Sequence, residues 1–185
     1  RYFEAYRNVQ VFSDSVQSVS DSLFYSFKDS VFQLFQNPVV WSRKSQITGD
    51  TIYMFTRNKK PQYVKAWERS FMVSEVQPGA YNQIRSSRMD GYFIDGVLDS
   101  VRARGAAQSV YFIQDRDSAF TSVNQTESDV IDLYFTKGDL QRVVLRSSVK
   151  GTVYPIRQKP PGEMRLENFQ WREELRPKTK YDLFE

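Results

Sequence analysis

The sequence predicts an all-β protein built from three-strand units that repeat along the chain and stack side by side. Aromatic residues make up 15% of the 185 residues, with 14 Phe and 11 Tyr, and this composition favours strands. Short β-type runs are separated by turn residues about every 8–12 residues, which is typical of an all-β sandwich, barrel or roll. Residues 8–25 and 37–55 are similar at a constant offset, which indicates that each unit packs on the next.

The two similar stretches share residue types in the same order. Each contains an asparagine, an aromatic residue, a serine, a glutamine and an aspartate. The aligned pairs are Asn8 and Asn37, Phe12 and Trp41, Ser13 and Ser42, Gln17 and Gln46, and Asp21 and Asp50.

An Asp-x-aliphatic/Tyr-aromatic anchor occurs four times, each time after a glutamine. Because alternate residues of a strand face opposite sides, each anchor predicts a strand with a large apolar side chain on both faces. The anchors span 21–24, 50–53, 90–93 and 132–135. The glutamines are Gln17, Gln46, Gln83 and Gln125.

Two further strands are expected after each anchor, with turn residues such as Asp95-Gly96 and Pro78-Gly79 between strands. Residues 1–12 are similar to the closing strand of a unit, so we expect the sequence to start inside a repeat array. A free-standing domain with an ordinary edge strand is the alternative. The second strands are predicted at 31–35, 63–67, 98–103 and 140–145, and the third strands at 39–41, 70–73, 109–112 and 149–154.

Residues 160–185 differ in character from residues 1–159. We predict a β domain over 1–159 and a charged, Pro-containing C-terminal extension over 160–185, which Pro160-Pro161-Gly162 opens. A last strand or a short helix both fit this extension, because periodicity does not separate them. Its apolar residues are Met164, Leu166, Phe169 and Trp171.

The composition argues against an enzyme. The chain has no cysteine and no histidine, which excludes disulfides, thiolate chemistry, the usual catalytic triads and the commonest zinc sites. Aspartates such as Asp90, Asp95 and Asp99 could form a carboxylate pair or a calcium loop, but their place between β-runs favours a role in turns. We therefore predict a non-enzymatic protein without cofactor or metal.

The charge pattern does not indicate a nucleic-acid partner. The formal net charge is +4, and the charges of both signs are interspersed along the chain. No run approaches the roughly 18–20 apolar residues that a membrane-spanning helix requires.

The apolar side chains exceed what one flat sheet could cover. A closed sandwich could bury all of them between its two inner faces. Alternatively, a folded-over sheet could enclose an elongated apolar groove for acyl chains. Composition does not separate these two arrangements.

The ordered series of motifs resembles the OstA family, the LptA-type proteins of lipopolysaccharide transport. In wording it is most similar to the OstA-like proteins of the Bacteroidetes, and the similarity covers essentially the whole chain. The motifs are Asn8-Val9-Gln10-Val11, Gly49-Asp50-Thr51-Ile52-Tyr53, DSVFQLFQNPVVWS at 29–42, QITGDTIYMFTRNKKP at 46–61, PGEMRLENFQW at 161–171 and RPKTKYDLF at 176–184.

This resemblance implies an open V-shaped β-jellyroll of stacked antiparallel strands in the periplasm of a Gram-negative cell. It also implies a function in outer membrane biogenesis. The protein would hold the lipid A acyl chains of lipopolysaccharide inside the V. Its partners would be other β-jellyroll domains, or further copies of itself, joined through edge strands. A signal peptide would lie outside this sequence.

Carried onto this chain through the alternation of strand faces, the resemblance gives a set of groove-facing candidates. The opposite set of faces is the alternative, because a slip of one residue exchanges them. Arg102, Arg104, Arg142 and Arg146 could meet lipid phosphates at a rim, or could simply be solvated. The groove candidates are Leu23, Tyr25, Val39, Trp41, Ile52, Met54, Phe71, Val73, Tyr92, Ile94, Val110, Phe112 and Tyr134.

Two other functions fit the sequence. The first is an envelope structural or protein-interaction module that pairs through its edge strands and carries no lipid. The second is a carbohydrate-binding β domain in which Trp41, Trp67 and Tyr92 stack on sugars.

Overall fold

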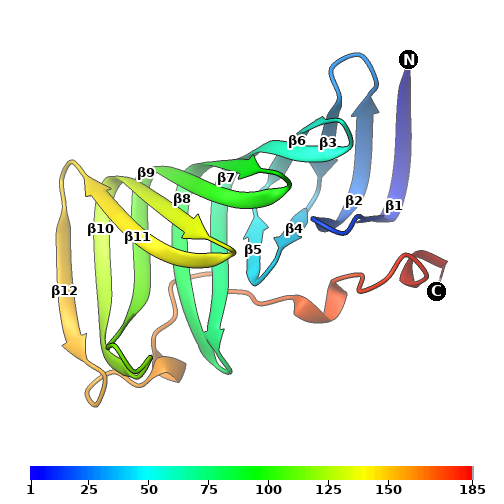
Figure 1. Cartoon of the computed structure of the whole chain (residues 1–185). Coiled ribbons are helices and arrows are strands. Elements are labelled where there is room, and N and C mark those ends of the chain that lie inside the picture. The colour runs from blue at the N-terminus through cyan, green and yellow to red at the C-terminus, as the bar shows by residue number, and fades with distance from the viewer. Residues whose placement is uncertain (185) are drawn as a thin grey trace.

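The computed structural model describes residues 1–184 and confirms the predicted all-β fold (Figure 1). Twelve strands form one antiparallel sheet, and three short 3₁₀ helices follow it. The strands are β1 (Tyr2–Phe12), β2 (Gln17–Ser26), β3 (Val31–Phe35), β4 (Val39–Ser42), β5 (Ser45–Thr48), β6 (Thr51–Arg57), β7 (Lys60–Gln77), β8 (Ala80–Ile94), β9 (Val97–Gln114), β10 (Phe120–Thr136), β11 (Asp139–Arg146) and β12 (Lys150–Pro155). The helices are η1 (Pro161–Glu163), η2 (Glu173–Leu175) and η3 (Asp182–Phe184).

The sheet is a meander of bent strands, each of which runs through two layers. β2 and β7 to β10 continue unbroken through the bend, whereas three other bent strands are interrupted there. The two pieces of each interrupted strand pair with the same neighbour, on opposite sides of its bend. β2 pairs with β3 and β4, β7 pairs with β5 and β6, and β10 pairs with β11 and β12. We call each bent strand a rung. In order, the rungs are β1, β2, β3–β4, β5–β6, β7, β8, β9, β10 and β11–β12.

The two layers are defined by the interrupted rungs. Layer A contains β3, β6 and β11 and the halves of the long strands that pair with them, and layer B contains β4, β5, β12 and the other halves. Figure 1 shows β7 to β10 turning from one layer into the other. Because β2 and β7 are unbroken while the two rungs between them are interrupted, the pairings β7–β5–β4–β2–β3–β6 close a ring of six strands.

Odd-numbered rungs bend through two consecutive residues with positive φ. Such a pair in a strand acts as a bulge, which bends the strand and reorients the side chains beyond it. Strand pairing shifts register at three of these bends, between Tyr6 and Val9, between Trp67 and Ser70, and between Arg104 and Ala107. The pairs are Arg7-Asn8, Gln36-Asn37, Glu68-Arg69, Gly105-Ala106 and Ser147-Ser148.

Three of the four even-numbered rungs bend at a serine. The hydroxyl groups of Ser20, Ser86 and Ser128 each donate to the carbonyl oxygen two residues further along, at 3.1, 2.9 and 2.9 Å. Such local side-chain bonds stabilise a turn of the backbone in place of a straight ladder. The bends of successive rungs therefore lie beside one another and form the spine along which the layers meet.

The predicted second and third strands are partly fused in the structure. Runs 63–67 and 70–73 both lie in β7, and runs 98–103 and 109–112 both lie in β9. The glutamine-bearing segment of the second unit, which the sequence analysis left outside the strands, is β5. The repeat is therefore a pair of bent rungs, one that contains a repeated glutamine near its start and the next one along the chain.

The four glutamines lie in one row across the sheet. Each pairs directly with a residue of the neighbouring rung, so the row runs perpendicular to the strands on the outer side of layer B. We call it the glutamine row. Its members in register are Gln17, Trp41, Gln46, Val73, Gln83, Val110 and Gln125.

The aspartate anchors of the third and fourth units do not occupy the same position in the repeat as those of the first and second units. Asp21 and Asp50 come four residues after their glutamines, whereas Asp90 and Asp132 come seven residues after Gln83 and Gln125. The position that repeats in space is the sixth residue after each glutamine. It is buried and apolar in all four units: Leu23, Ile52, Met89 and Ile131.

Candidate functional site

The space between the layers is a trough lined by one continuous apolar cluster. Layer A contributes residues such as Ile52, Phe93 and Leu133, and layer B contributes Met72 and Ile84. These side chains are at most 7% exposed, so the two layers pack directly on each other along much of the trough. Burial of this surface holds the layers together, at about 25 cal/mol for each Å² removed from water.

The trough has a mouth on the side away from the spine. A cavity of about 830 Å³ lies between the strand ends of layer B and the β10–β11 hairpin of layer A. Its lining combines apolar Leu140 and Val143 with polar Asn82 and Tyr111 and with cationic Arg142. The cavity thus offers an apolar floor with a polar and charged rim.

A narrow seam continues from the mouth into the trough. The residues Asn82, Tyr111, Leu140 and Val143 line both the mouth and this seam, where Phe135 also lies. The seam holds only about 10 Å³, which is at the limit of the room for one water molecule. The trough is therefore filled there by its own side chains.

The β10–β11 hairpin reaches across the mouth to layer B. Lys44, in the β4–β5 turn, and Asp139, at the start of β11, form an ion pair of 3.3 Å. Gly138 has a φ of +89°, and a Cβ there would lie 3.2 Å from the Cβ of Arg43. A side chain at this glycine would both strain the turn and press on layer B.

Some sequence-predicted groove residues lie in the trough and others do not. Leu23, Ile52 and Met54 belong to the interior cluster, and Tyr25 packs against it. Phe71, Val73, Val110 and Phe112 form a second cluster, on the outer side of layer B. Val39 and Trp41 are fully buried outside both clusters, Tyr92 and Ile94 are 45% and 61% exposed, and Tyr134 packs under Arg142 on the outer side of layer A.

The misaligned anchors explain part of this distribution. Counting two residues from Asp21 and Asp50 reaches the interior, but the same count from Asp90 and Asp132 reaches Tyr92 and Tyr134, which face outward. The constant spacing from each glutamine would have identified the interior residues instead. Interior residues that the sequence analysis missed are Val16, Leu34, Val40, Ile47, Val64, Ala66, Met72, Ile84, Met89, Phe93, Leu98, Val101, Ala103, Ala107, Ile131, Leu133 and Phe135.

The arginines considered as a phosphate rim are mostly engaged elsewhere. Arg102 and Arg146 bind buried Asp132 on the outer side of layer A, at 2.6 and 2.9 Å. The hydrogen bonds from Arg102, and then from Arg146, hold the pKa of this carboxyl below its ordinary value, although burial opposes the shift. Arg104 is exposed, and of the four only Arg142 lines the mouth.

Trp41 is completely buried, so it cannot stack on a sugar. In the part of the chain that the structure describes, no group of histidine, cysteine or acidic residues is placed to hold a metal ion. Among residues 1–184, no helix has the length and apolar character to cross a membrane.

The fold is similar to that of a solved lipopolysaccharide-transport protein. LptH from Pseudomonas aeruginosa, described as the LptA-homologous periplasmic component of the lipopolysaccharide transport device, superposes with a TM-score of 0.57. The match covers 76% of this chain and 95% of LptH, at 14% sequence identity. No protein-family model and no curated protein sequence matches this chain. The chain therefore has an LptA-like β-jellyroll fold.

Proposed function

We propose that this protein is a non-enzymatic periplasmic module that holds the acyl chains of lipopolysaccharide in the trough. The observation that carries the proposal is the continuous apolar interior, which opens at one mouth whose polar rim carries both basic and acidic side chains. An acyl chain in this interior would gain about 0.8 kcal/mol for each methylene group it buries. The fold shared with LptH, a periplasmic transport component, supports the same cargo.

The stack has free edges at both ends, which suit a bridge of similar domains. Within residues 1–184, β1 pairs only with β2, and β11 and β12 pair only with β10. On β1, Tyr2, Phe3 and Tyr6 are 65%, 55% and 69% exposed. Unpaired edges with exposed apolar side chains favour the addition of another strand. We propose that other LptA-type β-jellyroll domains, or copies of this chain, join here.

Cargo entry requires the layers to move apart. The seam has no room for an acyl chain in the described conformation, so the β10–β11 hairpin must swing away from the β4–β5 turn. The Lys44–Asp139 ion pair opposes this movement little, because it is largely exposed and such pairs contribute about 0–1 kcal/mol. The larger cost is the separation of Phe135, Leu140 and Val143 from layer B, which an acyl chain in the seam would offset.

A cargo-free interaction module is the second candidate. The filled seam favours it, because a seam with only about 10 Å³ of free space needs no ligand to complete its packing. In this case the edges alone would carry the function, and the apolar interior would be an ordinary core.

Photocrosslinking separates the two candidates. Phe135 lines the seam and its neighbour Tyr134 faces outward, and Phe93 and Tyr92 form a second such pair. A photoreactive phenylalanine analogue would be placed at each position in turn in the full chain, expressed in a Gram-negative envelope. We expect lipopolysaccharide adducts from Phe135 and Phe93 and none from Tyr134 and Tyr92.

Equal labelling of the inward and outward positions, or no adduct at all, would remove the lipid cargo. Circular dichroism of each variant checks that the substituted chain still folds. Protein adducts at β1 or β12 positions without any lipid adduct would favour the interaction module.

A further inference from the structure

The C-terminal tail, residues 160–184, crosses the outer side of layer B without joining the sheet. In Figure 1 it runs in orange and red from the end of β12, passes behind β8 and β7, and ends near β1. Its described residues form three 3₁₀ turns and no strand. Met164 and Leu166 are buried against the outer apolar cluster of layer B, which contains Phe71 and Val110. The tail is therefore docked on a finished sheet surface.

Glutamines of the glutamine row hold the tail by its backbone. The Nε2 group of Gln83 donates to the carbonyl oxygen of Met164 at 2.7 Å, and the N–H of Leu166 donates to Oε1 of Gln83 at 2.8 Å. The side-chain amide thus bonds the residues on either side of Arg165. A strand in a parallel ladder bonds its neighbour in the same way, so Gln83 replaces a β partner.

Gln46 repeats this arrangement six tail residues later. Its Nε2 donates to the carbonyl oxygen of Gln170 at 2.9 Å, and the N–H of Arg172 donates to its Oε1 at 2.8 Å. The third glutamine, Gln17, accepts from Nε of Arg176 at 2.8 Å. Successive glutamines of the row therefore meet successive segments of the tail.

Side chains add selectivity to this backbone recognition. The Arg165 guanidinium lies 4.8 Å from the ring centre of Tyr81 and 4.6 Å from that of Phe169. Trp171 also packs on Tyr81, with ring centres 5.3 Å apart. The cationic and aromatic side chains thus fit a receptor surface that layer B supplies.

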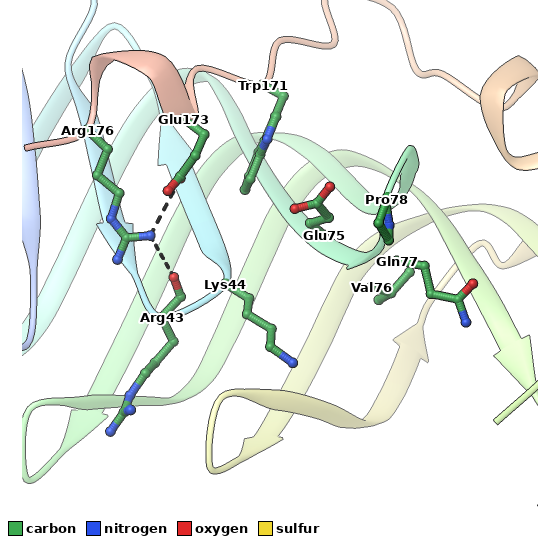
Figure 2. A pocket seen from close by; sticks show the side chains of 9 residues that line it. All are labelled: Arg43, Lys44, Glu75, Val76, Gln77, Pro78, Trp171, Glu173 and Arg176. Carbon is green, nitrogen blue, oxygen red and sulfur yellow. Dashed lines mark hydrogen bonds and ion pairs between the residues drawn. The ribbon is translucent and has the colours of Figure 1, made fainter. Parts of the chain in front are cut away.

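The tail is less closely packed beyond Trp171. Figure 2 shows Arg176 between the carboxylate of Glu173 and the carbonyl oxygen of Arg43. A cavity of about 320 Å³ separates this part of the tail from Lys44 and the β7–β8 turn. Polar bonds from Arg176 and the burial of Pro177 hold this part of the tail beside the cavity.

We propose that the glutamine row is a binding site for an extended polypeptide, with the tail as its resident occupant. The site accepts a segment of another molecule that has the tail's pattern. In that segment, Gln83 bonds the backbone on either side of an arginine, and Gln46 bonds the backbone on either side of an aromatic residue. Gln125 extends the row in register but is exposed, and the hydrogen bonds to the described part of the tail come from the other three glutamines. This inference is independent of whether the trough holds lipid.

A labelled peptide of residues 161–180 tests the proposal on the full chain. Tethering gives the resident tail an effective concentration on the order of mM, so micromolar peptide should bind the unaltered chain weakly. Replacing Arg165 and Trp171 of the tail by alanine weakens the occupant and leaves the row intact. We expect this tail variant to bind the peptide at least about tenfold more tightly than the unaltered chain does.

Row variants then identify the site. In the tail variant, Gln46→Ala should weaken peptide binding about tenfold, because two partly buried backbone groups of the peptide lose their partner. The matched control is Gln125→Ala, which should leave binding unchanged. The proposal is overturned if the tail variant binds no more tightly than the unaltered chain, or if Gln46→Ala and Gln125→Ala act alike.

A second measurement covers the case in which the double tail variant does not fold. Millimolar peptide is added to the isotope-labelled, unaltered chain, and hydrogen exchange is followed at the N–H groups of Leu166 and Arg172. Displacement of the tail predicts faster exchange at both groups. Unchanged exchange at saturating peptide would mean that the tail is a fixed part of the fold.

Discussion

Lys44 and Asp139 lie 95 residues apart in the chain, yet their 3.3 Å ion pair joins the two layers at the mouth of the trough. Lys44 belongs to a turn of layer B and Asp139 to the β10–β11 hairpin of layer A. The pair marks the place where the layers come together opposite the spine. A change there should alter access to the interior more than it alters stability.

Replacing Lys44 by alanine should open the mouth at little cost. The side chains of the pair are 67% and 62% exposed, so we expect the free energy of unfolding to fall by no more than about 1 kcal/mol. Binding of an apolar fluorescent dye to the folded protein should rise. The control is Arg69→Ala, which removes the Arg69–Asp50 pair beside the bends and should not change dye binding. Equal dye binding by both variants would contradict a gate at the mouth.

Two isoleucines distinguish the interior from the outer surface. Ile131 is completely buried in the trough, whereas Ile94 is 61% exposed. We expect Ile131→Ala to lower the free energy of unfolding by about 2–5 kcal/mol, through lost burial and the cavity left behind. Ile94→Ala should change it by less than about 0.5 kcal/mol. Urea denaturation measures both, and a large effect at Ile94 would reverse the assignment of the two faces.

Gln83 should matter more for stability than its repeat equivalent Gln125. Loss of the Gln83 side chain leaves the buried N–H of Leu166 without a partner and the carbonyl oxygen of Met164 with only its bond from Arg165, which costs about 1–3 kcal/mol. Gln125 is exposed, so Gln125→Ala should be nearly neutral. Thermal unfolding of the two variants gives the comparison. Similar melting temperatures would show that the bonds to the tail contribute nothing to the fold.

Asp132 should give the protein a specific sensitivity to acid. Its pKa is lower in the folded state than in the unfolded chain, so it stabilises the fold at pH values above the ordinary carboxyl pKa, near 4. This contribution is lost as the pH falls through the lower, folded-state pKa. Asp132→Asn should therefore reduce stability at pH 7 by about 1–2 kcal/mol, since both arginines are roughly half exposed.

The difference between Asp132→Asn and the unaltered chain should shrink as the pH falls below about 4. Urea unfolding at a series of pH values follows it. A difference that stays constant with pH would mean that packing, rather than the carboxylate charge, stabilises this site.

Spacing and turn chemistry were sufficient to predict much of this architecture. Alternating β-type runs and recurring turn residues predicted stacked antiparallel strands. The repeated glutamines were identified correctly, and they do occupy equivalent places in register. These features are local, because a strand pattern or a turn depends on residues close together in the chain.

The tertiary structure alone decided which faces point inward. Alternation divides a strand into two faces but does not say which one is buried, and the bends reorient the side chains that follow them. Tyr92 and Tyr134 consequently face outward, while Phe93 and Phe135 lie in the trough. The docking of the tail was equally invisible in the sequence, because Gln83 and Leu166 are 83 residues apart and become partners only when the whole sheet is assembled.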